Sequence, residues 1–396
     1  MREPNQMAQL FELEPITRLS RDLREAAASL SDDQIRYFVS AYYAVQKYRL
    51  ATEAQVRALT EAERPGSLLS WLTNQMDVLE RQVKTVLDKY TSSHPVGVWM
   101  KSQKGIGPVI SAGMLAHIDI KRATHVSHIW RFAGLDPSIV WRSSDYVKGH
   151  IASTRQQNKG DDWAAFLAIC KDLNRKPIDV LAASEHYADT GAPVADDAMR
   201  AVKALAQLNV KPRSVHSPDN ILHELLQKDK LPEAYKSIHP SSFKFDWKEI
   251  THILTKRPWN AELKTLCYKL GESFVFVSGD KNPGYYGLVY RTRKEHEQQL
   301  NSSGRYAEIA ANVLATGKYK RDTVAKSMYS QGRLPDAHIH RRACRYAVKL
   351  FLAHLHARWY EFHHKRKPPM PYVIDHLHHG DYIPPPLPVI TDEPAK

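Results

Sequence analysis

The sequence of 396 residues contains only three cysteines, Cys170, Cys267 and Cys344, and they lie far apart. This scarcity excludes the disulfide framework of a small secreted domain, and no two cysteines have the close spacing of a zinc site. Each cysteine lies among apolar residues at helical spacing. We therefore expect three reduced thiols in the core of a cytoplasmic protein.

Long hydrophobic runs are also absent. No stretch approaches the ~20 apolar residues that a membrane-spanning helix needs. Residues 1–15 lack the apolar segment of a signal peptide and resemble a flexible lead-in. These absences predict a cytoplasmic protein with no membrane partner.

The patterns that are present are helical. Ser31-Asp32-Asp33-Gln34 has the form of a capping box at the start of a long helix. Apolar residues then recur at alternating four- and three-residue steps from Leu72 to Val86, which is typical of a coiled coil and also compatible with an ordinary bundle helix. The predicted fold class is all-α: a helical hairpin or coiled coil, followed by a helix-hairpin-helix DNA-binding domain with a helical insertion.

Breaks in these patterns suggest six segments. They are a flexible N-terminus (1–15), a helical hairpin (16–90), a helix-hairpin-helix module (91–141), an inserted helical subdomain (142–255), a C-terminal helical part (256–364) and a tail rich in proline and histidine (365–396). Residues 138–162 are polar and predict an exposed loop at the start of the insertion. Beneath the hairpin module, we expect Trp130, Phe132 and Leu135 to close a small core.

Charge is distributed unevenly along the chain. Residues 1–100 hold 12 Lys and Arg against 13 Asp and Glu, whereas the remaining residues hold 44 against 30. The excess positive charge therefore begins at the hairpin module, which favours a nucleic-acid partner. A basic surface without a partner is the alternative.

The run Lys104-Gly105-Ile106-Gly107-Pro108 predicts a tight turn between two helices. Glycine permits left-handed dihedrals, and proline suits the first turn of the second helix. The free N–H groups of that second helix would face a phosphate. The predicted nucleic-acid contacts of this region are Lys101, Lys104, Gly105, Gly107, Val109, Lys121, Arg122 and Arg142, and Arg131 adds charge at the rim.

The last long helix carries a stripe of positively charged side chains. Its members are Arg341, Arg342, Arg345 and Lys349. Such a stripe is often only a solvated face, but its single sign favours phosphate contact. Nine of the 20 histidines fall between His338 and His379, yet the i, i+2 spacing of the helical pairs places them on diverging faces. We therefore predict no metal site and no cofactor.

A nucleophile is the remaining catalytic option. A two-metal nuclease needs several acids converging from strand ends, and the acids here lie on helices or in loops. Ser143 and Ser144 follow the hairpin module in a basic, polar stretch that could stabilise charge developing on a phosphodiester. Ordinary solvated serines are the alternative interpretation.

Several segments carry a resemblance: KGIGPVISAGMLAHIDI with HVSHIWRFAGLDP, then KRPWNAELKTLCYKLGESF, and finally GRLPDAHIHRRACRYAVKLFLAHLHARWY, within roughly 70–150 and 255–362. Together they resemble the C-terminal domain of one insertion-sequence transposase family. In that family a RuvC-like domain with a DEDD acid set is joined by a coiled coil to a helix-hairpin-helix domain with a catalytic serine, and a structured RNA guides the enzyme. The whole chain is similar to a transposase-related group of bacterial and phage proteins.

The resemblance implies DNA binding and descent from a transposase. The sequence departs from the family because residues 1–65 show no strand with a leading Asp, and because the insertion interrupts the serine loop. Three hypotheses follow: a protein that grips duplex or junction DNA, or structured RNA; a serine-dependent recombinase whose Mg²⁺ acid centre comes from a partner; and an architectural homo-dimer or higher oligomer assembled through residues 16–90.

Overall fold

The computed structural model describes residues 21–62, 66–137, 141–173, 175, 180, 246–279, 281–371 and 382–387. Within these ranges every regular element is a helix and no strand occurs. The predicted all-α fold class is thus confirmed. The lead-in 1–15, most of the insertion (181–245) and part of the tail lie outside the described residues.

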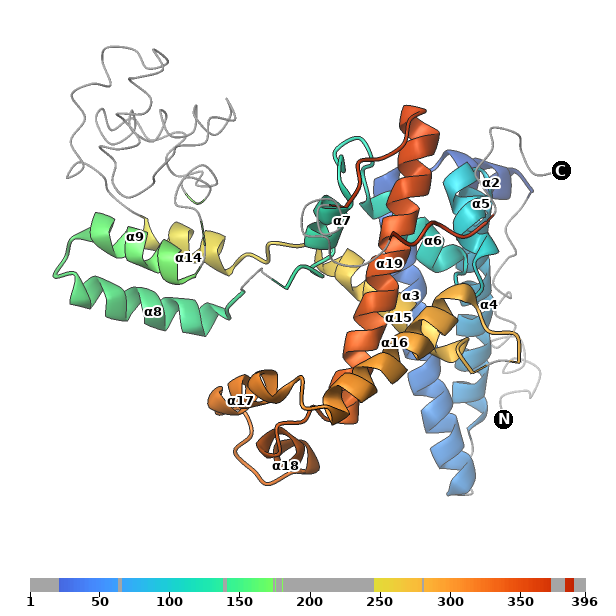
Figure 1. Ribbon diagram of the computed structural model, residues 1–396. Helices are drawn as coiled ribbons and strands as arrows, with labels where there is room; N and C mark the ends of the chain where they lie inside the picture. The colour runs from blue at the N-terminus through green and yellow to red at the C-terminus, as the bar shows by residue number, and fades with distance from the viewer. Residues whose placement is uncertain are drawn as a thin grey trace, which may run out of the picture. The chain divides into compact units, whose positions relative to one another are not determined.

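The chain divides into two compact units, Met1–Leu135 together with Asn260–Lys396, and Asp136–Trp259. The helices of the first unit, shown in Figure 1, are α2 (Arg21–Ala26), the 3-10 helix η1 (Ala27–Ser29), α3 (Asp32–Glu61), α4 (Ser67–Ser92), α5 (Pro95–Ser102), α6 (Pro108–His117), α7 (Val126–Phe132), α15 (Ala261–Phe276), α16 (Tyr285–Ser302), α17 (Ala307–Ala315), α18 (Val324–Ser330) and α19 (Asp336–His364). The helices of the second unit are α8 (Ser144–Gln157), α9 (Asp162–Asp172) and α14 (Trp247–Thr255).

Helix α3 begins where the sequence predicts. The Ser31 hydroxyl accepts a hydrogen bond from the Gln34 amide, and the Gln34 side chain accepts one from the Ser31 amide at 2.9 Å. Together these two bonds satisfy N–H groups that a helix start otherwise leaves without partners. The capping box is therefore confirmed.

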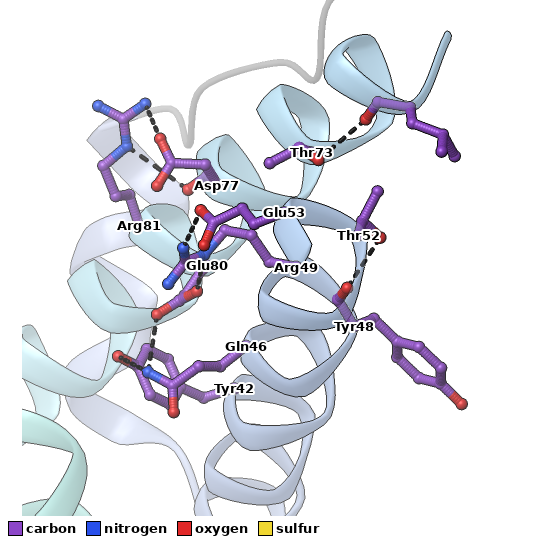
Figure 2. Close-up of polar contacts among 11 residues, drawn as sticks. Tyr42, Gln46, Tyr48, Arg49, Thr52, Glu53, Thr73, Asp77, Glu80 and Arg81 are labelled. Carbon is purple, nitrogen blue, oxygen red and sulfur yellow. Dashed lines mark hydrogen bonds and ion pairs between the residues drawn. The ribbon is translucent and has the colours of Figure 1, made fainter. Parts of the chain in front are cut away.

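Helices α3 and α4 pack side by side as a hairpin. Figure 2 shows the polar cluster that joins them: Glu80 accepts from Arg49 Nε at 2.7 Å and from Gln46 Nε2 at 3.1 Å. Burial works to raise the pKa of Glu80, but the hydrogen bonds from Arg49, Tyr42 and Gln46 outweigh it, so the pKa lies below its usual range. The buried carboxylate is thus held as an ion.

The predicted apolar seam of α4 is only partly buried. Val83 and Val86 enter the core, whereas Leu79 is 37 % exposed. Among the described residues between Val39 and Glu80, none is fully buried. The far half of the hairpin therefore carries apolar side chains without a core to cover them.

Helix α6 lies at the centre of the first unit. All of its residues from Val109 to His117 are buried, and it packs against α3, α4, α5 and α15. A Cβ added at Gly113 would lie 2.5 Å from Leu266 Cδ1 of α15. Glycine at this position is what permits the two helices to approach so closely.

One prediction about the core beneath the turn is wrong. Phe132 is 43 % exposed, and the residues of α7 that are buried are Val126 and Ile129, followed by Ala133. These three positions recur at i, i+3 and i+7, so they form the face that α7 turns toward the core. Trp130 and Leu135 pack against that core as half-buried residues.

The end of the chain passes back over α19. Among the described residues 382–387, Ile383 O accepts from His354 Nε2 at 2.9 Å. The other nitrogen of the His354 ring lies 3.0 Å from the Tyr286 hydroxyl. Burial lowers the pKa of His354 to about 4. The ring is therefore neutral at pH 7, and its hydrogen bond holds Ile383 against α19.

The second unit corrects another expectation. The sequence predicts an exposed loop over 138–162, but α8 occupies most of that stretch. Val147, Ile151 and Thr154 are buried at i, i+4 and i+7, and α8 packs on both α9 and α14. The polar residues that suggested a loop lie on the outward face of an amphipathic helix.

Candidate nucleic-acid interface

The turn between α5 and α6 has the local geometry that its sequence predicts. Gly105 has a φ of +96°, a region that favours glycine. Pro108 occupies the first turn of α6, and Gly107 precedes it as an N-cap with no side-chain hydrogen bond. The first N–H groups of α6 therefore lack a side-chain cap.

The connection between α15 and α16 packs against this turn. A Cβ added at Gly284 would lie 2.9 Å from Lys104 O, and Lys104 Nζ donates to the Asn282 carbonyl. The Ser273 hydroxyl donates to Gly105 O. The turn thus has neighbours on one side, while Lys104 and Gly107 are exposed.

Two other predicted residues of the hairpin have structural roles. Lys101 Nζ lies 2.7 Å from Asp88 Oδ1 and donates to the Ser92 hydroxyl at 2.6 Å, which ties α5 to α4. The Val109 side chain is in the core. Only its backbone N–H could therefore serve a ligand.

Lys121 and Arg122 follow α6 in the short connection to α7. Both are exposed, and the Asp119 carboxylate accepts from the Lys121 amide at 2.9 Å. The next carbonyl, that of Ala123, accepts from His356 Nε2 of α19 at 2.7 Å. The connection is therefore fixed to α19 and presents both cations to solvent.

The four cations of the α19 stripe differ in their surroundings. Arg341 donates to Glu272 at 2.8 Å and to the Tyr268 hydroxyl at 2.9 Å. Arg342 donates to Glu297 at 2.6 Å. Lys349 Nζ lies 4.3 Å from the centre of the Trp130 ring. Arg345 is exposed and has no hydrogen bond or ion pair with the described residues.

Glu297 is a buried acid that the sequence pattern does not single out. Its side chain is 1 % exposed and accepts from Arg293, Arg342 and Tyr306 at 2.5–2.9 Å. Burial opposes the charge, but these hydrogen bonds hold the pKa of Glu297 below its usual range. Arg342 is thereby committed to a structural ion pair, not to the open surface that the stripe suggests.

Four of the six histidines of α19 have polar partners. His338 and His340 meet the hydroxyls of Tyr329 and Tyr290 at 3.1 and 2.8 Å. His354 and His356 bond the carbonyls of Ile383 and Ala123. Among the described residues no group of three or more His, Cys, Asp or Glu could hold a metal ion. His376, His378 and His379 lie outside the described residues.

The candidate serines stand at the start of α8. The Ser143 hydroxyl accepts from the Tyr146 amide at 3.4 Å and caps the helix, and Ser144 is the first helical residue. Both are exposed. The Arg142 guanidinium lies 5.3 Å from the centre of the Tyr146 ring. A cation is therefore near the serines within this unit, and the Ser143 hydroxyl already has a structural role.

The cysteines are buried and free of disulfides. Burial raises the pKa of Cys170 and Cys267 to about 12 and that of Cys344 to about 11. Thiols with such pKa values are protonated at pH 7 and are poor nucleophiles. No described helix is long and apolar enough to cross a membrane.

Positive charge is concentrated in the C-terminal part of the first unit. Residues 260–371 hold 20 Lys and Arg but only nine Asp and Glu. This excess of 11 makes up most of the formal net charge of the whole chain, +13. This part of the chain includes α15, α16, α17, α18 and α19.

The protein is thus an all-α chain with its excess positive charge on one part of one compact unit. No family model matches the chain, and comparison with curated proteins and with solved structures found no similar protein.

Proposed function

We propose that the chain binds nucleic acid, that it descends from a transposase, and that it holds duplex or junction DNA on exposed cations of α7, α19 and the turn before α6. The excess of positive charge in the C-terminal part of the first unit carries the proposal. Cations that exceed the available carboxylates by 11 over the 112 residues 260–371 need counterions, and a phosphate backbone supplies them in a regular array.

The seam between α7 and α19 is the most direct support for this surface. Trp130 Nε1 donates to Lys349 O at 3.0 Å, and the Lys349 ammonium lies over the same ring. Arg131 follows Trp130 in the chain, and Arg345 lies one helical turn before Lys349 on the same face of α19. We call Arg131, Arg345 and Lys349 the α7–α19 basic seam.

Two members of the seam are suitable for mutation. Arg131 and Arg345 are exposed, and neither forms an ion pair or side-chain hydrogen bond with the described residues. Reversing their charge therefore removes no hydrogen bond or ion pair among the described residues. Replacing Arg342, in contrast, would leave the buried Glu297 carboxylate without this ion pair. A loss of DNA affinity in such a variant could then result from reduced stability.

The experiment is a fluorescence-anisotropy titration of labelled duplex and single-stranded DNA of equal length. We expect Arg131→Glu with Arg345→Glu to weaken duplex binding at least tenfold. The matched control is Lys84→Glu with Lys89→Glu on α4, which makes the same charge change on two exposed residues. Equal effects of the two pairs, or no binding by the wild-type chain, would refute the proposal.

A further inference from the structure

Residues 303–335, which we call the α17–α18 protrusion, form a small structure of their own within the first unit. Tyr306, Ala310, Tyr329, Leu334 and Ile339 make a hydrophobic cluster separate from the main core. Figure 1 shows α17 and α18 beyond the adjoining ends of α16 and α19. The protrusion therefore depends on those two helices for its position.

Three polar anchors fix this position. Asn301 of α16 bonds both backbone groups of Leu334, donating to the carbonyl at 2.9 Å and accepting from the amide at 2.8 Å. The Tyr306 hydroxyl donates to the buried Glu297 carboxylate at 2.5 Å. Tyr329 meets His338 of α19 at 3.1 Å. Contacts of this kind orient the protrusion as one piece with the helices beneath it.

The surface of the protrusion is strongly basic. It holds six Lys and Arg and two Asp and Glu. Lys326 is paired with Asp322 at 2.8 Å. The other five cations are exposed and form no ion pair with the described residues. They are Arg305, Lys318, Lys320, Arg321 and Arg333.

The loop between α17 and α18 concentrates three of these cations within four residues. Its Tyr319 ring packs on Tyr329 at a centroid distance of 5.3 Å, which ties the loop to the small core. Lys318, Lys320 and Arg321 flank Tyr319 in the sequence and are exposed. The run Lys-Tyr-Lys-Arg is visible in the sequence, but only the fold shows that its tyrosine is an anchor.

One exposed apolar side chain follows the loop cations in the chain, three residues after Arg321. Val324 is 81 % exposed at the start of α18, next to Thr323, whose hydroxyl caps that helix. The other exposed residues of α18 and its end are small or polar: Ser327, Ser330 and Gln331. A membrane surface would require several apolar side chains on one face. In a duplex groove, by contrast, phosphates flank base edges that a single apolar side chain can touch.

We propose that the α17–α18 protrusion enters a groove of duplex nucleic acid, with Lys318, Lys320 and Arg321 on the phosphates and Val324 against the base edges. This inference rests on the proposed function and adds a second contact element to it. The protrusion has its own core and its own cations. Variants of the protrusion can therefore leave binding by the α7–α19 basic seam unchanged.

The test compares affinity and salt dependence for a labelled duplex. We expect Lys318→Glu with Lys320→Glu and Arg321→Glu to bind at least tenfold more weakly, and the slope of log affinity against log salt to shrink by about 2 to 3, near 0.9 per lost phosphate contact. The matched control reverses three exposed cations of the α3–α4 hairpin, Lys47, Arg57 and Lys84.

A second variant addresses the apolar contact. We expect Val324→Asn to weaken binding at least threefold with an unchanged salt slope, because it removes no charge. A photo-crosslinking amino acid at position 324 should attach to bases of the duplex. Circular dichroism spectra that match wild type would show that each variant is folded.

The outcomes separate the two proposals. A triple variant that binds as its control does, while Arg131→Glu with Arg345→Glu weakens binding, would overturn this inference and leave the proposed function in place. Equal losses on duplex DNA and on polyglutamate, with no crosslink at position 324, would also overturn it by showing a general polyanion contact. No binding of the wild-type chain to nucleic acid would refute both.

Discussion

Arg342 and Arg345 lie one turn apart on α19, and their surroundings give them different roles. Arg342 donates to the buried Glu297 carboxylate, whereas Arg345 is exposed without an ion pair among the described residues. The sequence places both in one basic stripe, because the partner of Arg342 comes from α16, 45 positions away. A stripe of like residues therefore indicates charge but not which charges are already neutralised.

The buried carboxylate provides a test of this distinction. Glu297→Gln should lower the free energy of unfolding by about 2–4 kcal/mol, because removing one member of a buried ion pair leaves its partners uncompensated. We expect less than the roughly 3–5 kcal/mol of a fully buried pair, because Arg293 and Arg342 both reach solvent. The control Glu272→Gln removes a half-exposed carboxylate that binds Arg341 and should cost about 1 kcal/mol or less. Urea unfolding at pH 7 measures both, and equal costs would contradict the account.

The same carboxylate predicts a pH dependence. Its pKa is lower in the folded chain than in the unfolded chain, so the unfolded state takes up the proton first as pH falls. The stabilisation is therefore complete above the ordinary pKa of about 4.5 and is lost at lower pH. The stability difference between wild type and Glu297→Gln should shrink below that pH. A stability difference between the two proteins that stays constant down to pH 3 would argue against an ionised Glu297 in the folded chain.

Ser143 requires a variant that separates capping from chemistry. Ser143→Ala should destabilise α8 by about 1 kcal/mol through loss of the N-cap, whereas Ser143→Asn should keep most of the cap. Thermal unfolding measures this difference. In a supercoiled-plasmid cleavage assay, a serine nucleophile predicts that both variants lose a covalent protein–DNA adduct. An adduct that survives in Ser143→Asn would exclude Ser143 as the nucleophile.

At the scale of elements, local signals in the sequence locate helix starts well. Ser31 with Gln34, and Gly107 with Pro108, predict the starts of α3 and α6 because the chemistry of a cap is contained within a few residues. The wrong predictions need information from distant residues. The stretch that became α8 is polar on its outer face, and Phe132 is exposed because α7 turns Ile129 inward. The docking of the α17–α18 protrusion likewise depends on Asn301 and Glu297 of α16.

The far half of the α3–α4 hairpin predicts self-association. It lacks fully buried residues between Val39 and Glu80 among those described, and Leu68, Trp71 and Leu79 of α4 are exposed. These three positions share one face of the helix, so a second copy could cover them. We expect light scattering to show a concentration-dependent dimer. The dissociation constant of this dimer should be at least tenfold larger for Leu79→Asp.

The control for this prediction is Leu387→Asp, the same change at an exposed residue of the tail. It should leave the dimer intact. A wild-type chain that stays monomeric over a 100-fold range of protein concentration would rule out self-association through this face.

At the scale of the whole molecule, charge and fold together support the proposed function. The all-α class follows from helical periodicity throughout the chain. The excess of cations over residues 260–371 is a property of composition. The fold places some of these cations beside α7, on α19, and others on the α17–α18 protrusion. What the sequence could not indicate is the pairing of each cation, because ion pairs such as those of Lys101 and Arg342 join residues 13 and 45 positions apart.

The salt dependence of duplex affinity tests the central claim most directly. Several phosphate contacts release several counterions, so the slope of log affinity against log salt should be steeper than about −3 for the wild-type chain, at about −0.9 per contact. The slope should fall in magnitude by about 2 for Arg131→Glu with Arg345→Glu. A slope near zero that these substitutions leave unchanged would contradict nucleic-acid binding by this surface.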